Sequence, residues 1–199
     1  LMSKSDFEDF LSQAQEVASL IHKNLDRTAQ LVNSFKQVSV DQTSELARDF
    51  NVNEYIQEVL LSLSSVLKRS KLDSKIICDQ HLIIYSYPGL LSQIISNLVI
   101  NSNIHGFPNN EQGKVMIEVS VDEGELLIEY RDNGCGIKEE NLSKIFDPFY
   151  TTNRHNGGSG LGLNIVYNIV TKQLRGTINC FSESGVRFVI RYPVKLVSI

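Results

Sequence analysis

The chain has 199 residues, of which 42% are hydrophobic and 21% are charged, values typical of a globular protein with a hydrophobic core. Its formal net charge of −4 argues against general nucleic-acid binding, which depends on clustered lysines and arginines. The three cysteines form no CxxC pair, which indicates a reduced cytoplasmic chain, and neither a signal peptide nor an apolar run of membrane-spanning length is present.

The first segment, residues 3–38, contains neither glycine nor proline and carries an apolar stripe at heptad spacing. The stripe consists of Phe7, Phe10, Leu11, Ala14, Val17, Ala18, Ile21, Leu25, Leu31, Val32 and Phe35. This spacing, sustained for roughly four heptads, predicts one long helix of a coiled coil or four-helix bundle. Because a single helix cannot cover its own stripe, we expect self-association through residues 3–38 of a second copy.

The rest of the chain mixes helices with strand pairs that are adjacent in sequence. After a linker (38–50) that ends in a short strand, we expect helices at 53–69, 88–105 and 158–174, short strands at 75–79 and 82–87, and hairpins at 114–132 and 176–194. This order predicts an α+β fold, a two-layer sandwich with helices on one face of an antiparallel-rich sheet. We place the domain boundary between residues 48 and 49.

Two asparagines mark the predicted helix at 88–105. Asn97 and Asn101 are four residues apart, so they share one face of the helix among Leu, Val and Ile residues. Buried amides need hydrogen-bond partners, which a ligand or a neighbouring helix could supply. From this pair alone, a helix-packing amide network is as good an interpretation as a binding site.

A glycine pattern follows the predicted hairpin at 114–132. Asp132, Gly134 and Gly136 alternate directly after a strand, and the glycines permit positive φ or close approach to a flat ligand. By itself this pattern is better explained as a tight turn. In the next segment, IFDPFYTT (145–152), we expect a turn anchored by Phe146 and Phe149 in the core.

A second glycine-rich segment, GGSGLGL (157–163), directly precedes an apolar helix. Free backbone N–H groups at such a helix start form a natural phosphate site. The segment is not a Walker A motif, because no Gly-Lys-Ser/Thr follows, and Leu163 stands where a dinucleotide fold requires its third glycine. A flexible linker is disfavoured, because Leu161 and Leu163 already belong to the helix pattern.

Four features follow one another in the chain: the asparagine pair, the Asp132-Gly134-Gly136 pattern, IFDPFYTT and GGSGLGL. In this order they resemble the ATP-binding catalytic domain of sensor histidine kinases. That domain belongs to a superfamily shared with gyrase, mismatch-repair and heat-shock chaperone ATPases. The resemblance covers residues 49–193 and implies the Bergerat-type sandwich, with ATP and Mg²⁺ as ligands. Residues 1–48 would then be the second helix of a dimerisation hairpin, followed by a linker.

The resemblance also assigns roles to single residues. Asp132 would accept a hydrogen bond from the adenine amino group, with Gly134, Gly136 and Ile137 around the base. Asn101 would coordinate Mg²⁺ through its side-chain oxygen, a hard ligand suited to that ion.

The glycine-rich loop and a mobile lid (151–157) would hold the phosphates. The residues implied are Asn97, Phe149, Thr151, Thr152, Gly158, Ser159, Gly160, Leu161, Gly162 and Leu163. Arg154, within the lid, would reach the γ-phosphate, and Phe149 resembles the aromatic residue that moves with the lid.

The chain departs from the family pattern beyond Asn101. Ile104 stands where family members often have a lysine, and His105 could supply the phosphate contact instead. The alternative for His105 is a helix-end histidine that interacts with the helix dipole. Cys135, between the two glycines, has no chemical role that we can derive.

The resemblance favours a kinase over an ATPase. Hydrolytic branches carry a glutamate base four residues before the magnesium ligand, whereas Asn97 at this position cannot accept a proton. The phosphoryl acceptor would be a histidine on a helical hairpin. His22, the sole histidine of residues 3–38, is followed by Lys23 and lies beside the apolar stripe, so we interpret it as a solvated residue and expect the acceptor before Leu1.

We therefore predict phosphoryl transfer to a histidine, with a response regulator or phosphotransfer domain as partner. No nucleic-acid or membrane contact is expected of this chain, which would be cytoplasmic or the cytoplasmic portion of a membrane-anchored sensor. Two alternatives remain open: an anti-sigma-type serine kinase of the same superfamily, and a non-catalytic nucleotide-dependent dimerisation module.

Overall fold

The computed structural model describes residues 10–11, 13–19, 21, 25, 46–69, 71–107, 112–153 and 159–197. The chain divides into two compact units, Leu1–Thr43 and Ser44–Ile199. The described residues of the first unit are helical, and its apolar side chains there are exposed within this chain: Phe10, Leu11, Val17, Ile21 and Leu25. Ala14 and Ala18 of the predicted stripe are also helical and exposed, whereas Phe7, Leu31, Val32, Phe35 and His22 lie outside the described residues. No helix among the described residues is long and apolar enough to cross a membrane.

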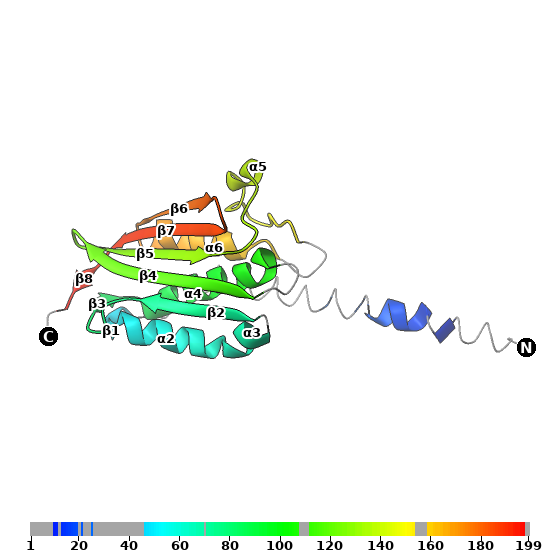
Figure 1. Cartoon of the computed structure of the whole chain (residues 1–199), viewed down its shortest axis with the longest axis horizontal. Helices are drawn as coiled ribbons and strands as arrows, with labels where there is room; N and C mark the ends of the chain where they lie inside the picture. Colours follow the sequence, from blue (N-terminus) through cyan, green and yellow to red (C-terminus); the bar gives the residue numbers. More distant parts are fainter. Residues whose placement is uncertain are drawn as a thin grey trace, which may run out of the picture. The chain divides into compact units, whose positions relative to one another are not determined.

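The second unit is a mixture of strands and helices (Figure 1). Its strands are β1 (Arg48–Asn51), β2 (Leu72–Ile77), β3 (Ile83–Ser86), β4 (Gly113–Asp122), β5 (Glu125–Asp132), β6 (Thr177–Ser182), β7 (Val186–Pro193) and β8 (Lys195–Leu196). Its α-helices are α2 (Val52–Ser62), α3 (Ser64–Arg69), α4 (Pro88–Asn101), α5 (Glu139–Leu142) and α6 (Gly162–Asn168). Two π-helical segments, η1 (Ser102–Gly106) and η3 (Ile169–Gln173), continue α4 and α6.

The strands form two sheets. The larger has the order β2-β4-β5-β7-β6, in which β2 and β4 are parallel and the other neighbours are antiparallel. The smaller sheet has the order β1-β3-β8 and is antiparallel. In Figure 1, α4 and α6 lie on one face of the larger sheet, which confirms the predicted two-layer α+β sandwich.

The core lies between this sheet and the helices. Buried and less buried residues alternate along β4, β5 and β7, so one face of each strand meets the helices. Fully buried residues on the strands and helices include Ile117, Leu126, Ile128, Ile190, Ile94, Leu98 and Val166. The alternation of β5 places Asp132 on the same face as Ile128 and Tyr130, which is how a carboxylate reaches the edge of the core.

Local sequence explains the main boundaries. Asn51 caps α2, accepting a hydrogen bond from the Glu54 N–H at 3.1 Å, and Pro88 opens α4 as predicted. The hairpin predicted at 114–132 is β4–β5, and Glu123 and Gly124 in its turn both have positive φ.

Three predicted elements differ in detail. The helix expected at 53–69 is interrupted at Leu63, between α2 and α3. The helices expected at 88–105 and 158–174 are α-helical only at Pro88–Asn101 and Gly162–Asn168, and each ends in a π-helical segment. A wider turn of this kind shifts the side chains that follow it relative to an α-helical register.

The sheet core yields a prediction on stability. We expect Ile128→Ala to lower the free energy of unfolding by about 3 kcal/mol, because the side chain is fully buried between the sheet and the helices. Ile77→Ala, on β2, is the matched control and should cost less than about 1 kcal/mol, since Ile77 is 40% exposed. Urea unfolding measures both values. Equal losses in the two variants would contradict this assignment of the core.

Candidate functional site

Three of the predicted motifs meet at one end of α4. A Cβ atom placed on Gly162, the first residue of α6, would lie 3.2 Å from Asn97 Oδ1 and 3.4 Å from Asn101 Oδ1. A Cβ atom on Gly134 would lie 2.6 Å from the Gly106 carbonyl oxygen. The asparagine pair, the loop after β5 and the start of α6 are therefore neighbours, although they are far apart in sequence.

The carboxylate of Asp132 lies at the centre of this arrangement and is 8% exposed. Its Oδ1 atom accepts hydrogen bonds from the backbone N–H groups of Gly134 (3.0 Å) and Val186 (3.1 Å). Its Oδ2 atom accepts a hydrogen bond from the Ser102 hydroxyl at 2.5 Å. One carboxylate thus links β5, its following loop, β7 and the helical layer.

Ser102 is the first residue of η1 and is itself buried. The Tyr130 hydroxyl lies 2.8 Å from Ser102 Oγ and 3.1 Å from the Leu98 carbonyl oxygen. Burial, together with the nearby charge of Asp132, raises the pKa of Tyr130 well above its ordinary value, although the hydrogen bond to Ser102 acts in the opposite direction. Tyr130 is therefore a neutral hydroxyl and can donate one hydrogen bond.

The loop after β5 is fixed against η1 and the β6–β7 turn. The backbone N–H of Cys135 donates to the Gly106 carbonyl (2.9 Å), and that of Ile137 donates to Ser182 Oγ (2.7 Å). Gly136 has a φ of +75°, a conformation that L side chains rarely adopt. A tight turn and a platform for a flat ligand, the two interpretations of this pattern, are both compatible with this geometry.

Asn97 and Asn101 differ in their surroundings. Asn97 Nδ2 donates to the Gln93 carbonyl of its own helix at 2.9 Å. Asn101 Nδ2 is buried and has no hydrogen-bond partner among the described residues. An unpaired buried amide is unfavourable, so we expect its partner to come from a ligand or solvent.

The possible metal ligands near Asn101 fit Mg²⁺, which needs few protein ligands, better than a metal ion that is bound by protein side chains alone. Within the described ranges, no group of three or more His, Cys, Asp or Glu residues could hold a metal ion. Mg²⁺ usually takes one or two protein oxygens, and water and phosphate oxygens complete its shell. The Asn101 Oδ1 atom, which faces Gly162, is an oxygen of this kind.

The glycine-rich segment enters α6 through Gly160, whose φ is +69°. A Cβ atom there would lie 2.5 Å from the Phe149 carbonyl carbon, so only glycine fits against residues 149–150. Ser159 Oγ accepts a hydrogen bond from the Leu161 N–H at 3.3 Å, and Leu161 is buried. The N–H groups of the first turn of α6 have no partner within the helix, as at any helix start.

Between the two glycine-rich segments, one expectation about residues 145–158 is wrong, and others concern residues that the structure does not describe. Phe149 was expected in the core, but it is 57% exposed and has a φ of +65°, because its backbone packs against Gly160. Phe146 contacts Tyr167 and Phe188 with its ring, as a core anchor would. Arg154 and Gly158 lie outside the described residues.

The start of the predicted lid lies against η1. Thr152 Oγ1 lies 3.5 Å from His105 Nδ1, and Asn153 Nδ2 donates to the Ile104 carbonyl at 3.4 Å. Burial lowers the pKa of His105 below its ordinary value, so the imidazole is neutral near pH 7. His105 thus contacts the start of the predicted lid through Thr152, and its contact with a phosphate stays a prediction.

Several residues of the site were not identified from the sequence, namely Ser102, Tyr130, Ser182 and Gly185. A side chain on Gly185 would overlap the Asp132 carbonyl oxygen, so β7 can approach β5 here only through glycine. Tyr130 had a detectable signal, since it lies two residues before Asp132 on the same strand face. Ser102 and Ser182 gave no such signal, because isolated serines are common in helices and strand ends.

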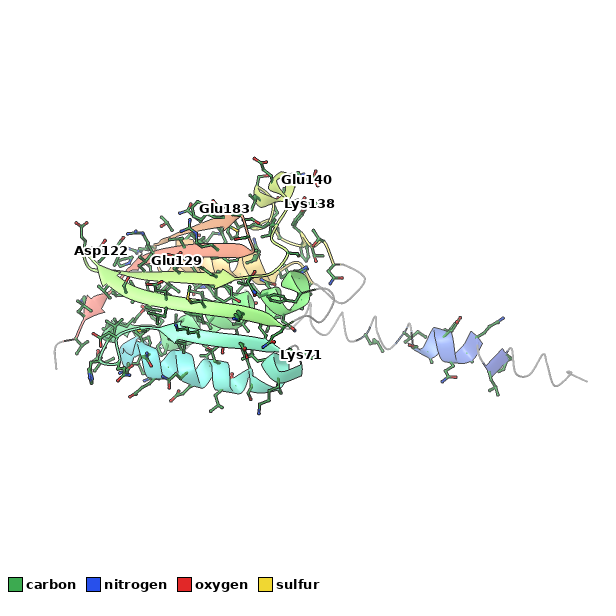
Figure 2. All side chains as sticks on the ribbon, in the orientation of Figure 1. Lys71, Asp122, Glu129, Lys138, Glu140 and Glu183 are labelled. Atoms are coloured by element: carbon green, nitrogen blue, oxygen red, sulfur yellow. The ribbon has the colours of Figure 1, made fainter. Side chains whose placement is uncertain are left out.

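The site lies at one end of the larger sheet. Figure 2 shows Asp122, the last residue of β4, at the opposite end of that sheet from Lys138 and Glu140, which lie just before and within α5. Asp122 is exposed, in contrast to Asp132 at the other end of the same hairpin. The two aspartates therefore share a hairpin but not an environment.

The sequence matches the profile of the family described as "Histidine kinase-, DNA gyrase B-, and HSP90-like ATPase" over residues 87–196. The chain is 39% identical over 117 residues to the autoinducer 2 sensor kinase/phosphatase LuxQ of Vibrio cholerae, which is 54% of this chain and 13% of LuxQ. It is 34% identical to an anti-sigma F factor of Clostridium botulinum, over 52% of this chain and 69% of that protein. The chain thus spans a small part of the sensor kinase and about two thirds of the anti-sigma factor.

The fold is also that of solved kinase structures. The catalytic domain of histidine kinase ThkA has a TM-score of 0.66 and 29% identity, and the match covers 75% of this chain and 96% of that domain. A second ThkA structure, in complex with the response regulator protein TrrA, shares the fold with a TM-score of 0.67 at 24% identity, over 85% of this chain and 48% of the ThkA chain. The family profile covers more than half of the chain, and the chain therefore belongs to the histidine kinase-, DNA gyrase B- and HSP90-like ATPase family.

Proposed function

We propose that this chain binds ATP with Mg²⁺ and transfers the γ-phosphoryl group to a histidine in two-component signalling. The observation that carries the proposal is the meeting of Asp132, Asn101 and Gly162 at one end of α4. A nucleoside triphosphate requires three parts of a site: a hydrogen-bond acceptor for the nucleobase, an oxygen ligand for the metal ion, and a glycine-rich helix start for the phosphates. Sensor kinases among the relatives support the same conclusion.

Each part has a proposed task. Asp132 accepts a hydrogen bond from the adenine amino group, while Gly134, Gly136 and Ile137 surround the base. The backbone N–H groups at Gly160–Leu163 bind phosphate oxygens, with Ser159 beside them. Arg154 and Gly158, which the family resemblance assigns to the phosphates, complete the proposed phosphate site.

Asn101 would hold Mg²⁺ through Oδ1. Held there, Mg²⁺ would supply positive charge that stabilises the phosphate oxygens. The chain's own contribution is positioning, because Asn101 on α4 and Gly162 on α6 lie close enough to act on the same phosphate groups.

Transfer is favoured over hydrolysis by the chemistry of Asn97. An amide cannot take a proton from water, and its Nδ2 is already engaged with the Gln93 carbonyl. Bound ATP should therefore be hydrolysed slowly and remain available to a protein nucleophile.

A second candidate is serine phosphorylation of the anti-sigma type. The anti-sigma F factor relative supports it, since the match covers 69% of that protein at 34% identity. The heptad pattern of residues 3–38 favours the histidine kinase, in which such a helix belongs to the dimerisation hairpin. The unpaired Asn101 amide fits a bound ligand in either case, and the transfer assay below separates a kinase from a non-catalytic nucleotide-dependent dimerisation module.

We further propose a response regulator or phosphotransfer domain as partner, and self-association through residues 3–38. The solved complex of ThkA with its response regulator supports the first, and the exposed apolar residues of the first unit support the second. The formal net charge of −4 supports a chain without a nucleic-acid partner. We propose a cytoplasmic location because the three cysteines of the sequence form no CxxC pair.

Nucleotide binding is tested by Asp132→Asn. Replacing the carboxylate removes the acceptor for the adenine amine, and we expect a loss of binding free energy on the order of 2 kcal/mol, measured by calorimetric titration with ADP and Mg²⁺. Asp122→Asn, at the opposite end of the sheet, is the matched control and should bind as the wild type does (Figure 2). Equal affinities for all three proteins would remove Asp132 from the nucleotide site.

Phosphoryl transfer is tested with labelled ATP, Mg²⁺ and a separate helical hairpin that carries a histidine followed by an acidic residue. We expect label on the hairpin and none on this chain, because the neighbour of His22 is Lys23 and not an acidic residue that would orient the imidazole. Asn101→Ala should abolish the transfer.

Alkaline quenching preserves phosphohistidine in this assay, and acid treatment distinguishes it from phosphoserine. Acid-stable label on a serine would favour the anti-sigma alternative. Stoichiometric label on this chain that is lost in His22→Gln would show that the chain carries its own acceptor.

A further inference from the structure

Three buried polar groups form one hydrogen-bonded chain beneath the site. Tyr130, Ser102 and Asp132 are 0%, 5% and 8% exposed, respectively. The Tyr130 hydroxyl lies 2.8 Å from Ser102 Oγ, and Ser102 Oγ lies 2.5 Å from Asp132 Oδ2. Ser102 stands directly after Asn101 in the sequence and belongs to η1, whereas the other two residues belong to β5.

The acceptor capacity of Asp132 is nearly filled. A carboxylate has about four acceptor positions, two on each oxygen. Oδ1 uses both of its positions, for the N–H groups of Gly134 and Val186, and Oδ2 uses one for Ser102. Among the described residues, one acceptor position on Oδ2 is therefore left for a ligand.

The direction of the hydrogen bonds is also fixed. A carboxylate can only accept, so the Ser102 proton points to Oδ2. The lone pairs of Ser102 then face the Tyr130 hydroxyl, which donates to them, with the Leu98 carbonyl as a longer alternative at 3.1 Å. The chain therefore runs in one direction, from Tyr130 to Ser102 to Asp132, and ends in an acceptor.

We infer that Ser102 and Tyr130 are positioning residues that hold Asp132 Oδ2 as a single, oriented acceptor for an N–H of the purine amino group. They thereby set the preference for adenine over hypoxanthine, whose carbonyl oxygen in the same place would face Oδ2 without a proton between them. The inference rests on the proposed nucleotide binding and adds the residues that determine the choice of base.

The test compares ADP with inosine diphosphate, both with Mg²⁺, by calorimetric titration of the whole chain. We expect the wild type to prefer ADP, and Ser102→Ala to reduce the ratio of the two affinities about tenfold. The loss should fall on ADP, because only ADP uses the oriented Oδ2 atom. Ser102→Thr keeps the hydroxyl and should keep most of the preference, and Tyr130→Phe should give a smaller reduction than Ser102→Ala.

Ser182→Ala is the matched control. Ser182 Oγ also holds the loop after β5, through the Ile137 N–H, but it has no hydrogen bond to Asp132. Its loss should weaken ADP and inosine diphosphate together and leave their ratio as in the wild type. A merely structural role of Ser102 would give this same result.

The outcomes separate the inference from the proposed function. An unchanged ratio in Ser102→Ala would overturn the inference while nucleotide binding stands, as would equal affinities of the wild type for the two nucleotides. A wild type that binds neither nucleotide would overturn both. If thermal unfolding shows that Ser102→Ala is not folded, Tyr130→Phe decides the question, because a ratio equal to that of the wild type would contradict the inference.

Discussion

The burial of one carboxylate, that of Asp132, constrains most of the site. A charged group removed from water must be hydrogen-bonded or its burial becomes very costly. Asp132 meets this condition through donors from three directions, namely its own loop, β7 and η1. The sheet and the helical layer must therefore stand in register at this point, and the close approaches at Gly134 and Gly185 follow from that requirement.

The end of α4 supplies the contacts that Asp132 and its loop make with the helical layer. An α-helix that continued past Asn101 would direct the following side chains differently, whereas the π-helical segment η1 places Ser102 on Asp132 and Gly106 against Gly134. The same segment contacts Thr152 and Asn153 through His105 and Ile104. The proposed base recognition, the proposed metal ligand and the start of the predicted lid thus all depend on seven residues of one helix end, from Asn101 to Phe107.

Much of the fold could be predicted because its signals are local. The two hairpins are visible as alternating strands around turn residues, and the two-layer class follows from their order with the helices. The parallel pairing of β2 with β4 and the short strand β8 could not be predicted in this way, because pairing between strands distant in sequence leaves no local pattern. The break at Leu63 and the π-helical ends were likewise not predicted from the sequence.

The motif residues of the site were found for a similar reason, since glycines and paired asparagines are conspicuous. The residues that hydrogen-bond to these motifs were missed. Ser102 and Ser182 are ordinary residues, and they make these hydrogen bonds only when β5, β7 and α4 come together. Phe149 was placed wrongly in the core, because the sequence does not reveal that its backbone packs against Gly160 and directs the ring outward.

The most direct measurement of the central claim, that three separated segments form one nucleotide site, is amide hydrogen exchange with and without ADP and Mg²⁺. We expect slower exchange in three segments together, Asn101–Phe107, Asn133–Ile137 and Gly160–Leu163, and unchanged exchange in the smaller sheet of β1, β3 and β8. Protection that spares the loop after β5, or that appears mainly in the smaller sheet, would contradict the claim.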